Sequence, residues 1–284
     1  MQKLFLLLAV FVFCGGALAQ VSVPRESQPA MITQLIGDTN VKISYNRPNI
    51  KNRKVWGELV PLGKVWRTGA NENTTFEVDR DITVNGQKLP AGKYGLHTIP
   101  NQNEWIVIFS KANADWGSFT YDEKKDALRV TAKPQTADFQ ETMAIGFENI
   151  RLNTADAVIA WEKVKVPFTI DVGDVNARTL GEFRKQMGAL KADDVKTPTD
   201  GANWILTSKA TGNYEEALNW VNAGLKNRET FGLLVTKARL LSELGKKSEA
   251  IATGEKAVQV GKASTPAANT ANFEKTLAGW KAQK

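Results

Sequence analysis

The chain has 284 residues, of which 42% are hydrophobic and 24% charged, and its formal net charge is +7. This length and composition allow a sizeable buried core and predict a globular protein of one or two domains. The positive charge is spread too thinly along the chain to indicate a nucleic-acid-binding protein.

Residues 1–19 have the layout of a secretory signal peptide. Lys3 comes before the apolar run LFLLLAVFVF, and the small-residue pattern Ala17-Leu18-Ala19 comes after it. The alternative of a membrane anchor is disfavoured, because the run is shorter than the roughly 20 residues that span a bilayer. We expect cleavage after Ala19 and export to the periplasm or to the outside of the cell.

Cleavage at that position would remove Cys14, which is the only cysteine of the chain. The mature protein would then hold no disulfide, thiol nucleophile or thiolate metal ligand. Loss of Lys3 would lower the formal charge from +7 to +6. Cys14 also raises the alternative of a lipoprotein, but Phe13 precedes it where lipidation requires a small residue.

Residues 20–173 predict an all-β domain. Between Met31 and Ile170, short runs with period two are separated by clusters of Gly, Pro, Asn and Asp, and no convincing helical period is present. Gly37-Asp38-Thr39 and Asn85-Gly86 predict hairpin turns. The spacing gives about nine to eleven strands, which is typical of a β-sandwich or a flattened barrel.

Three runs carry most of the strand prediction in this domain. EWIVIFS is apolar on both faces, so we expect it in the middle of a layered structure. AVIAW and KVKVPFTI predict two separate strands, and in the second Val166 and Phe168 face inward while Lys165 and Thr169 face outward. Pro167 suits an edge strand, because it cannot donate a hydrogen bond to a neighbour.

Residues 174–284 predict an α-helical domain, because β-branched alternation gives way there to Ala, Leu, Lys and Glu at helical spacing. The runs TLGEFRKQMGALK and GANWILTSKA predict its first two helices, and Thr197-Pro198-Thr199-Asp200 is expected to separate them and to supply caps. The predicted fold class is α+β by segregated domains.

Two segments of the helical part, GNYEEALNWVNAGL from Gly212 and GKKSEAIATGEKAV from Gly245, align at an offset of 33 residues and match Ala217 to Ala250. This resembles a tetratricopeptide array, whose repeat is about 34 residues and whose groove holds a protein partner. The alternative is a plain helical hairpin. The final run ANFEKTLAGWKAQK would be a capping helix.

Recognisable catalytic motifs are absent from the chain. His97 is the only histidine, which excludes zinc sites built on two or three imidazoles. Asp79 and Asp81 do not fit a calcium loop, and turn formation explains them. There is no nucleophile elbow, phosphate loop or dinucleotide-binding glycine motif. We therefore expect no metal and no other cofactor.

The segment VWRTGANENTT, residues 65–75, is the best candidate for a binding surface. Its arginine can hold a carboxylate or phosphate with two hydrogen bonds, and its amide and glutamate can take hydroxyl groups. The alternative is an ion pair between Arg67 and Glu72 that only braces the loop. We expect one polar pocket lined by Arg67, Asn71, Glu72, His97 and Arg47.

Basic residues gather in and just before this segment. They suit an anionic ligand such as a phosphate or an acidic glycan, or else they form a solvated loop face. Glu58 is the only acidic residue among Arg47, Lys51, Arg53, Lys54, Lys64 and Arg67.

Tryptophans in the β part could form a platform on which a sugar ring stacks. Trp105 and Trp161 lie in apolar strands and are expected in the core, whereas Trp56 and Trp116 each precede a glycine in a loop and are expected to be exposed. His97 shares a strand face with apolar residues, which favours a packed ring over a general base.

Several motifs of the β part carry a family likeness. SYNRPNIKNRKVWGELVPLGKVWRTGANENTTFE, LPAGKYGLHTIPNQNEWIVIFS and WGSFTYDEKKDALRV occur in this order. They resemble the secreted bacterial proteins of the domain-of-unknown-function 2911 family, over roughly Ser22 to Asp171. The resemblance implies an exported β domain of uncharacterised activity, often followed by a helical tail.

Two functions of different class are compatible with these observations. The first is a non-catalytic envelope protein whose β domain binds a glycan or an anionic small ligand and whose helical repeats bind a protein partner. The second is a hydrolase of an envelope polymer or glycan, with Glu72 and either Glu77 or Asp79 as acid and base. The lack of a recognisable carboxylate-pair motif favours binding.

Overall fold

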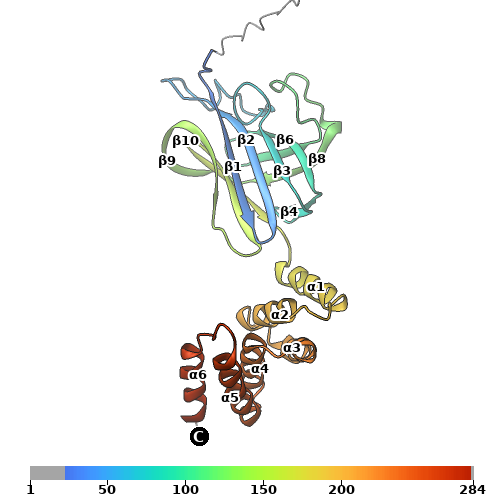
Figure 1. The fold of residues 1–284 in the computed structure, drawn as a ribbon. Coiled ribbons are helices and arrows are strands. Elements are labelled where there is room, and N and C mark those ends of the chain that lie inside the picture. Colours follow the sequence, from blue (N-terminus) through green and yellow to red (C-terminus); the bar gives the residue numbers. More distant parts are fainter. Residues whose placement is uncertain (1–22, 283–284) are drawn as a thin grey trace, which may run out of the picture. The chain divides into compact units, whose positions relative to one another are not determined.

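The computed structural model describes residues 23–282, and these divide into two compact units between Val172 and Gly173 (Figure 1). The first, here called the β unit, contains the strands, and the second, the helical unit, contains the α-helices. The predicted fold class, α+β with segregated parts, is confirmed. The predicted signal peptide, residues 1–19 with Cys14, lies outside the described residues.

The β unit is a sandwich of two antiparallel sheets. One sheet has the order β1 (Gln28–Ile36), β2 (Thr39–Arg47), β3 (Thr75–Val78), β6 (Gly92–Ile99), β7 (Trp105–Ser110), β8 (Asp126–Ala132). The other has the order β5 (Gln87–Leu89), β4 (Ile82–Val84), β10 (Thr154–Asp171), β9 (Gln135–Glu148). The ring centroids of Phe109 in β7 and Phe168 in β10 lie 6.1 Å apart, so the two sheets share one hydrophobic core.

Two hairpin turns form where the sequence predicts them. Ile36 pairs with Thr39, which leaves Gly37 and Asp38 as a two-residue turn. Val84 pairs with Gln87 around Asn85 and Gly86, whose φ angles are 46° and 79°. Two positive φ angles give the backbone twist that a two-residue hairpin requires.

Strand β10 differs from its prediction, because AVIAW and KVKVPFTI form one strand of 18 residues. Its pairing with β9 shifts register around Glu162, whose φ is 57°, and this bulge breaks the alternation on which the prediction of two strands depends. β10 is also an interior strand. Pro167 is tolerated there because pairing with β9 ends at Lys165 and pairing with β4 begins at Ile170.

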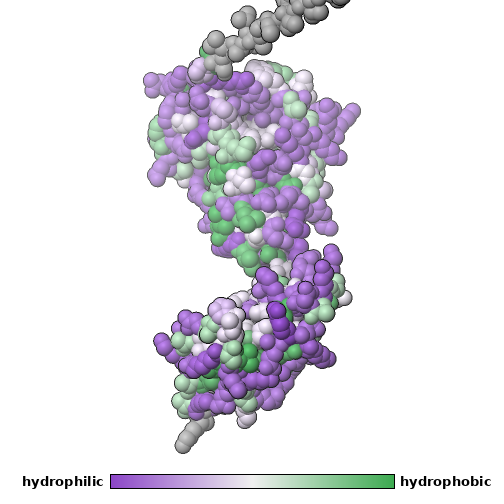
Figure 2. Space-filling view, viewed as in Figure 1, coloured by the Kyte–Doolittle hydropathy of each residue, from purple (hydrophilic) through white to green (hydrophobic). Residues whose placement is uncertain are grey.

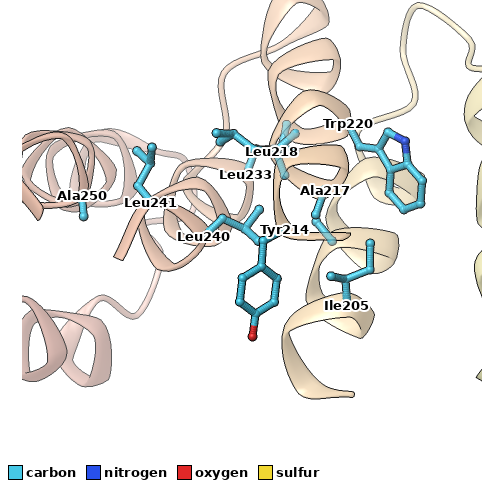
Figure 3. Close-up of a cluster of buried hydrophobic side chains, with 11 residues drawn as sticks. Ile205, Tyr214, Ala217, Leu218, Trp220, Leu233, Leu240, Leu241 and Ala250 are labelled. Atoms are coloured by element: carbon cyan, nitrogen blue, oxygen red, sulfur yellow. The ribbon is translucent and has the colours of Figure 1, made fainter. Parts of the chain in front are cut away.

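Six α-helices make up the described part of the helical unit, and helices adjacent in sequence pack against one another. Buried side chains from α2 to α5, including Ile205, Tyr214, Leu233 and Leu240, form the cluster drawn in Figure 3. None of the described helices combines the length and the apolar character needed to cross a membrane. The helices are α1 (Val175–Gly188), α2 (Lys196–Thr207), α3 (Tyr214–Asn227), α4 (Phe231–Glu243), α5 (Lys247–Ala263) and α6 (Ala271–Ala282).

The prediction of a separator at Thr197-Pro198-Thr199-Asp200 is wrong, because α2 begins at Lys196 and includes these residues. The carboxylate of Asp194 accepts hydrogen bonds from the backbone N–H groups of Lys196 and Thr197, both at 2.9 Å, and so caps the helix one turn earlier. Proline is compatible with a first helical turn, because its missing N–H would have no partner within the helix.

The surface of both units is mainly hydrophilic on the face that Figure 2 shows, with scattered hydrophobic patches. Large hydrophobic side chains that stay exposed in the β unit include Met31 of β1 and Phe139 of β9. The two most unusual are Trp116 and Phe119, which lie close together on the connection between β7 and β8.

Candidate functional site

The segment from Trp66 to Asn73 is an irregular loop fixed at both ends by isolated β-bridges. Trp66 pairs with Thr98 of β6, and Glu72 pairs with Trp116. At the centre, Gly69 has a φ of 158°, and a Cβ there would lie 2.9 Å from Thr74 Oγ1 and 3.0 Å from the Asn46 carbonyl oxygen. Only glycine fits that space, so the loop packs directly onto β2.

A cluster of four tryptophans packs against this loop. Its members are Trp56, Trp66, Trp105 and Trp161. Trp66 and Trp161 stack with centroids 6.0 Å apart, and the Trp66 Nε1–H donates to the Gly69 carbonyl oxygen at 3.1 Å. Trp105 and Trp161 are each 2% exposed, which confirms their expected place in the core. Trp56 is not the exposed residue that the sequence suggests, because its indole packs within this tryptophan cluster.

A cavity of about 350 Å³ opens beside the loop, and we call it the Arg67 pocket. Trp66 and Trp161 contribute to its lining, and its polar lining consists of Glu26, Ser27, Arg53, Arg67 and Asn71. Glu26 forms an ion pair with Lys51 rather than with either arginine. The pocket therefore has two guanidinium groups, and its own carboxylate is already paired.

Arg67 is half-buried, and its side chain has no hydrogen-bond or ion-pair partner among the described residues. Its Nε lies fully buried, and its Cζ lies 6.0 Å from the centroid of the Trp116 ring. Burial lowers the pKa of the guanidinium from its usual value, because desolvation disfavours the charged form. An arginine in this state retains its donors for an anionic group that enters the pocket.

Glu72 does not form the loop-bracing ion pair with Arg67 that was the alternative to a binding site. Its two carboxylate oxygens accept from Nη1 of Arg25, at 2.5 and 2.7 Å, and one also accepts from Asn46 Nδ2 at 3.2 Å. The hydrogen bond from Arg25 is the main reason that the pKa of Glu72 lies below its usual value. Glu72 is therefore an ionised, paired side chain and a poor general acid.

The remaining predicted residues lie in different places. Asn71 lines the Arg67 pocket, has a φ of 56°, and donates through Nδ2 to the Ser27 carbonyl oxygen at 3.3 Å. Arg47 lies outside that lining, and its Nε donates to the Met143 carbonyl oxygen at 2.8 Å, which links β2 to β9.

His97 is 3% exposed in β6 and lines neither of the two cavities described for the β unit. Its ring centroid lies 5.4 Å from that of Tyr121, and its Nδ1 has no partner among the described residues. Burial lowers the pKa of His97 to about 4, against a smaller opposing effect of Asp115. The ring is thus neutral and packed at physiological pH.

A second cavity, of about 630 Å³, has Glu72 and Asn73 in its lining, and we call it the sheet-face groove. Residues of β1, β2, β3 and β6 line it together with residues 113–115, and its polar side chains include Lys42, Ser44, Glu72, Lys93 and Asp115. The predicted set is therefore divided: Arg67 and Asn71 lie in one cavity, and Glu72 lies in the other.

The carboxylates proposed as partners of Glu72 in a hydrolase are engaged elsewhere. Glu77 forms an ion pair with Lys42 at 2.8 Å. Asp79 accepts from the backbone N–H and from Nδ2 of Asn40, at 3.0 and 2.9 Å. Neither residue belongs to the lining of the groove that Glu72 lines.

Residues 27–170, roughly half of the chain, match the model of a family described as a protein of unknown function, DUF2911. The chain belongs to the DUF2911 family. The matched segment begins just before β1 and ends in β10, so in this DUF2911 protein it includes both cavities almost entirely. No curated protein matches the chain, and no solved structure matches it.

Sequence reasoning did not identify Ser27, Arg25 or Trp161 as parts of this region. Arg25 and Ser27 precede β1 and approach the loop only through folding, across 47 and 44 positions of sequence. Arg53 lines the Arg67 pocket. The sequence indicates this residue only through the cluster of basic residues to which it belongs.

Proposed function

We propose that the β unit binds a polar ligand through an anionic group, a carboxylate or a phosphate, in the Arg67 pocket, without catalysis. The observation that carries this proposal is a half-buried guanidinium beside a cavity, with no partner among the described residues. A partly desolvated charge without a partner is costly, and such groups are usually paired in proteins. A ligand anion would supply the missing partner.

Arg53 supports the same assignment. Its Nε and Nη2 donate to the carbonyl oxygens of Ile50 and Asn49, at 2.8 and 2.5 Å, so its guanidinium is held at the pocket by backbone groups. Glu26 is close enough to Arg53 for an electrostatic interaction, but it forms its ion pair with Lys51. Two cations held at one cavity favour an anion, and the fixed position of Arg53 lowers the ordering cost of binding.

Binding is favoured over hydrolysis because Glu26, the carboxylate in the described lining of the Arg67 pocket, is paired with Lys51. Glu72 is paired with Arg25 and lies in the other cavity, and Glu77 is paired with Lys42. An inverting or retaining glycosidase needs two carboxyl groups that face the same bond.

We expect Arg67→Met to abolish ligand binding without loss of stability. The Tm of the wild-type protein is measured with and without glucuronate, galacturonate and sugar phosphates. Glucose and galactose serve as the uncharged counterparts. The charged compounds should raise the Tm of the wild type, and the variant should show no rise. The free variant should melt at the same or a higher temperature, because it loses an unpaired buried charge and keeps the apolar stem.

The matched control is Arg151→Met, which removes an exposed arginine of the same unit outside the pocket lining. This variant should retain the wild-type shift. If no charged compound shifts the wild type, or if Arg67→Met retains the shift, the pocket does not bind anions in this way.

We further propose that the protein is exported to the envelope and that its helical unit binds a protein partner there. Residues 1–19 support export. For the partner, α3 and α5 begin at Tyr214 and Lys247, which are 33 positions apart, as the aligned segments require. The matched Ala217 and Ala250 are 0% and 1% exposed, which supports equivalent packing in a repeat array.

One experiment tests both parts of this proposal. Intact producing cells are treated with a lysine-reactive cross-linker, and the purified protein is analysed by mass spectrometry. We expect an N-terminal peptide that begins at Gln20, and cross-links from the helical unit to one recurrent envelope protein. A retained leader or a lipid on Cys14 would contradict export with cleavage, and cross-links confined to this chain would contradict the partner.

A further inference from the structure

The connection between β7 and β8 displays two large aromatic rings, here called the aromatic pair. Trp116 is 61% exposed and Phe119 is 84% exposed. Their rings stack with centroids 6.2 Å apart and an interplanar angle of 17°. Large aromatic side chains that are exposed next to each other form a contiguous apolar surface, and such a surface is typical of a binding site.

The backbone fixes the aromatic pair in this arrangement. Gly117 has a φ of 76°, and a Cβ there would lie 2.9 Å from two atoms of the Phe119 ring. Glycine therefore permits both the turn and the ring that lies over it. A platform formed in advance saves the entropy of ordering two aromatic side chains when a ligand arrives.

The same backbone ties the aromatic pair to the loop that carries Arg67. The Gly117 N–H donates to the Asn71 carbonyl oxygen at 3.2 Å, and the Asn73 N–H donates to the Asp115 carbonyl oxygen at 3.1 Å. The side-chain amide of Asn73 faces the same connection, and its nitrogen is assigned to the side of the Gly117 and Asp115 carbonyl oxygens, at 2.6 and 3.3 Å, because the opposite orientation would place oxygen against oxygen. With Arg67 Cζ 6.0 Å from the Trp116 ring, the aromatic pair directly adjoins the anion-binding group.

We infer that the ligand of the Arg67 pocket is an acidic oligosaccharide, whose carboxylate pairs with Arg67 while a neighbouring sugar stacks on the aromatic pair. The inference rests on the proposed function of that pocket and names its ligand class. A pyranose ring offers an apolar C–H face to an aromatic ring, and its hydroxyl groups need polar partners along the same surface. Asp115 precedes Trp116 in the chain, and Glu72 pairs with Trp116 through an isolated β-bridge. Both residues line the sheet-face groove, and their carboxylates can accept hydrogen bonds from sugar hydroxyl groups.

A membrane surface is the competing partner for exposed aromatic rings. The connection that carries the aromatic pair has no excess of positive charge, because its lysines (Lys111, Lys124, Lys125) equal its carboxylates (Asp115, Asp122, Glu123) in number. Membrane-surface segments usually carry clusters of lysine and arginine that attract anionic headgroups, and this connection offers them no net attraction. A chain of sugars with spaced carboxylates fits the unpaired guanidinium of Arg67 and the adjoining aromatic pair better.

The test compares chain lengths by isothermal titration calorimetry on the full protein. The probes are uronic acids (galacturonate, mannuronate, glucuronate), their linear tetramers, and neutral tetramers of the corresponding hexoses. We expect the wild type to bind at least one acidic tetramer about tenfold more tightly than its monomer, since a stacked ring contributes about that factor. Neutral tetramers should bind weakly, because they lack the partner of Arg67.

Phe119→Ala should remove most of the gain from chain length and leave binding of the monomer unchanged. Trp116→Ala should remove the same gain, and because it also removes the ring that lies 6.0 Å from Arg67 Cζ, its effect is judged by the ratio of tetramer to monomer affinity. Phe139→Ala is the matched control, because it removes an exposed phenylalanine, 59% accessible, of the same unit. Substitutions of exposed residues rarely change stability by more than about 0.5 kcal/mol, so the variants should stay folded. Arg67→Met should abolish binding of both monomer and tetramer.

The outcomes separate this inference from the proposed function. If monomers bind through Arg67 but the two aromatic variants keep the preference for tetramers, the aromatic pair is not a sugar subsite and the proposed function survives. If no acidic sugar of either length binds, the inference is overturned. If the aromatic variants instead lose binding to vesicles of phosphatidylglycerol and phosphatidylethanolamine, while no oligosaccharide binds, the aromatic pair contacts membranes.

Discussion

Trp161→Ala is expected to destabilise the β unit by about 3 to 5 kcal/mol, the range observed for truncation of large buried aromatic side chains. Trp161 is 2% exposed and contacts two other members of the tryptophan cluster, Trp56 and Trp66, at centroid distances of 6.0 Å. Its Nε1–H donates to the Glu141 carbonyl oxygen at 3.1 Å. The substitution would leave a cavity under the Arg67 pocket and a carbonyl oxygen without its donor.

Hydrogen exchange followed by mass spectrometry measures this effect for each unit separately. Peptides from residues 28–171 should lose protection by the stated free energy, whereas peptides from residues 175–282 should not change. Trp116→Ala is the matched control, because that tryptophan is 61% exposed, and its effect should stay within about 0.5 kcal/mol. A loss below about 1 kcal/mol for Trp161→Ala would show that the cluster does not hold the fold together.

Those features of the fold that depend on neighbouring residues could be predicted from the sequence. The turn at Asn85 and Gly86 forms as expected, because two residues that tolerate positive φ determine a hairpin locally. Trp116 is exposed as expected, but the same signal, a following glycine in a loop, fails for Trp56, whose indole packs within the tryptophan cluster. Strand β10 also shows where this kind of prediction fails. One bulge at Glu162 interrupts the period-two alternation, so the sequence pattern predicts two strands where the structure has one.

The candidate site shows that the contact partners of a side chain are harder to predict from the sequence than the segment on which the side chain lies. The sequence indicates the loop that carries Arg67 as a candidate site. The partner of Glu72 is Arg25, which lies 47 positions away, and no local sequence pattern predicts that contact. Asn71 and Glu72 are consecutive, yet each lines a different cavity. The chain turns at Asn71, whose φ is 56°, so closeness in sequence does not place two side chains in one pocket.

Acid should destabilise the β unit through His97. An unperturbed histidine has a pKa near 6.5, and burial lowers the pKa of His97 in the folded protein to about 4. Between these values the unfolded chain binds a proton that the folded protein does not bind. The free energy of unfolding therefore falls by about 1.4 kcal/mol for each pH unit in this window. The contribution of the neutral ring is complete above about pH 6.5 and is lost progressively as the pH falls to about 4, a total of about 3 kcal/mol.

His97→Phe isolates this effect from the titration of carboxylates, because phenylalanine keeps an aromatic ring against Tyr121 and cannot bind a proton. Near pH 7 the two proteins should be almost equally stable, since Nδ1 of His97 has no partner to lose among the described residues. Urea unfolding, followed by tryptophan fluorescence from pH 7 to pH 4, gives the difference between the two, and the helical unit contributes equally to both. The variant should be the more stable protein at pH 4 by about 3 kcal/mol. Parallel curves would mean that the folded protein protonates His97 as readily as the unfolded chain does, for example because Asp115 pairs with the charged ring when the connection between β7 and β8 opens.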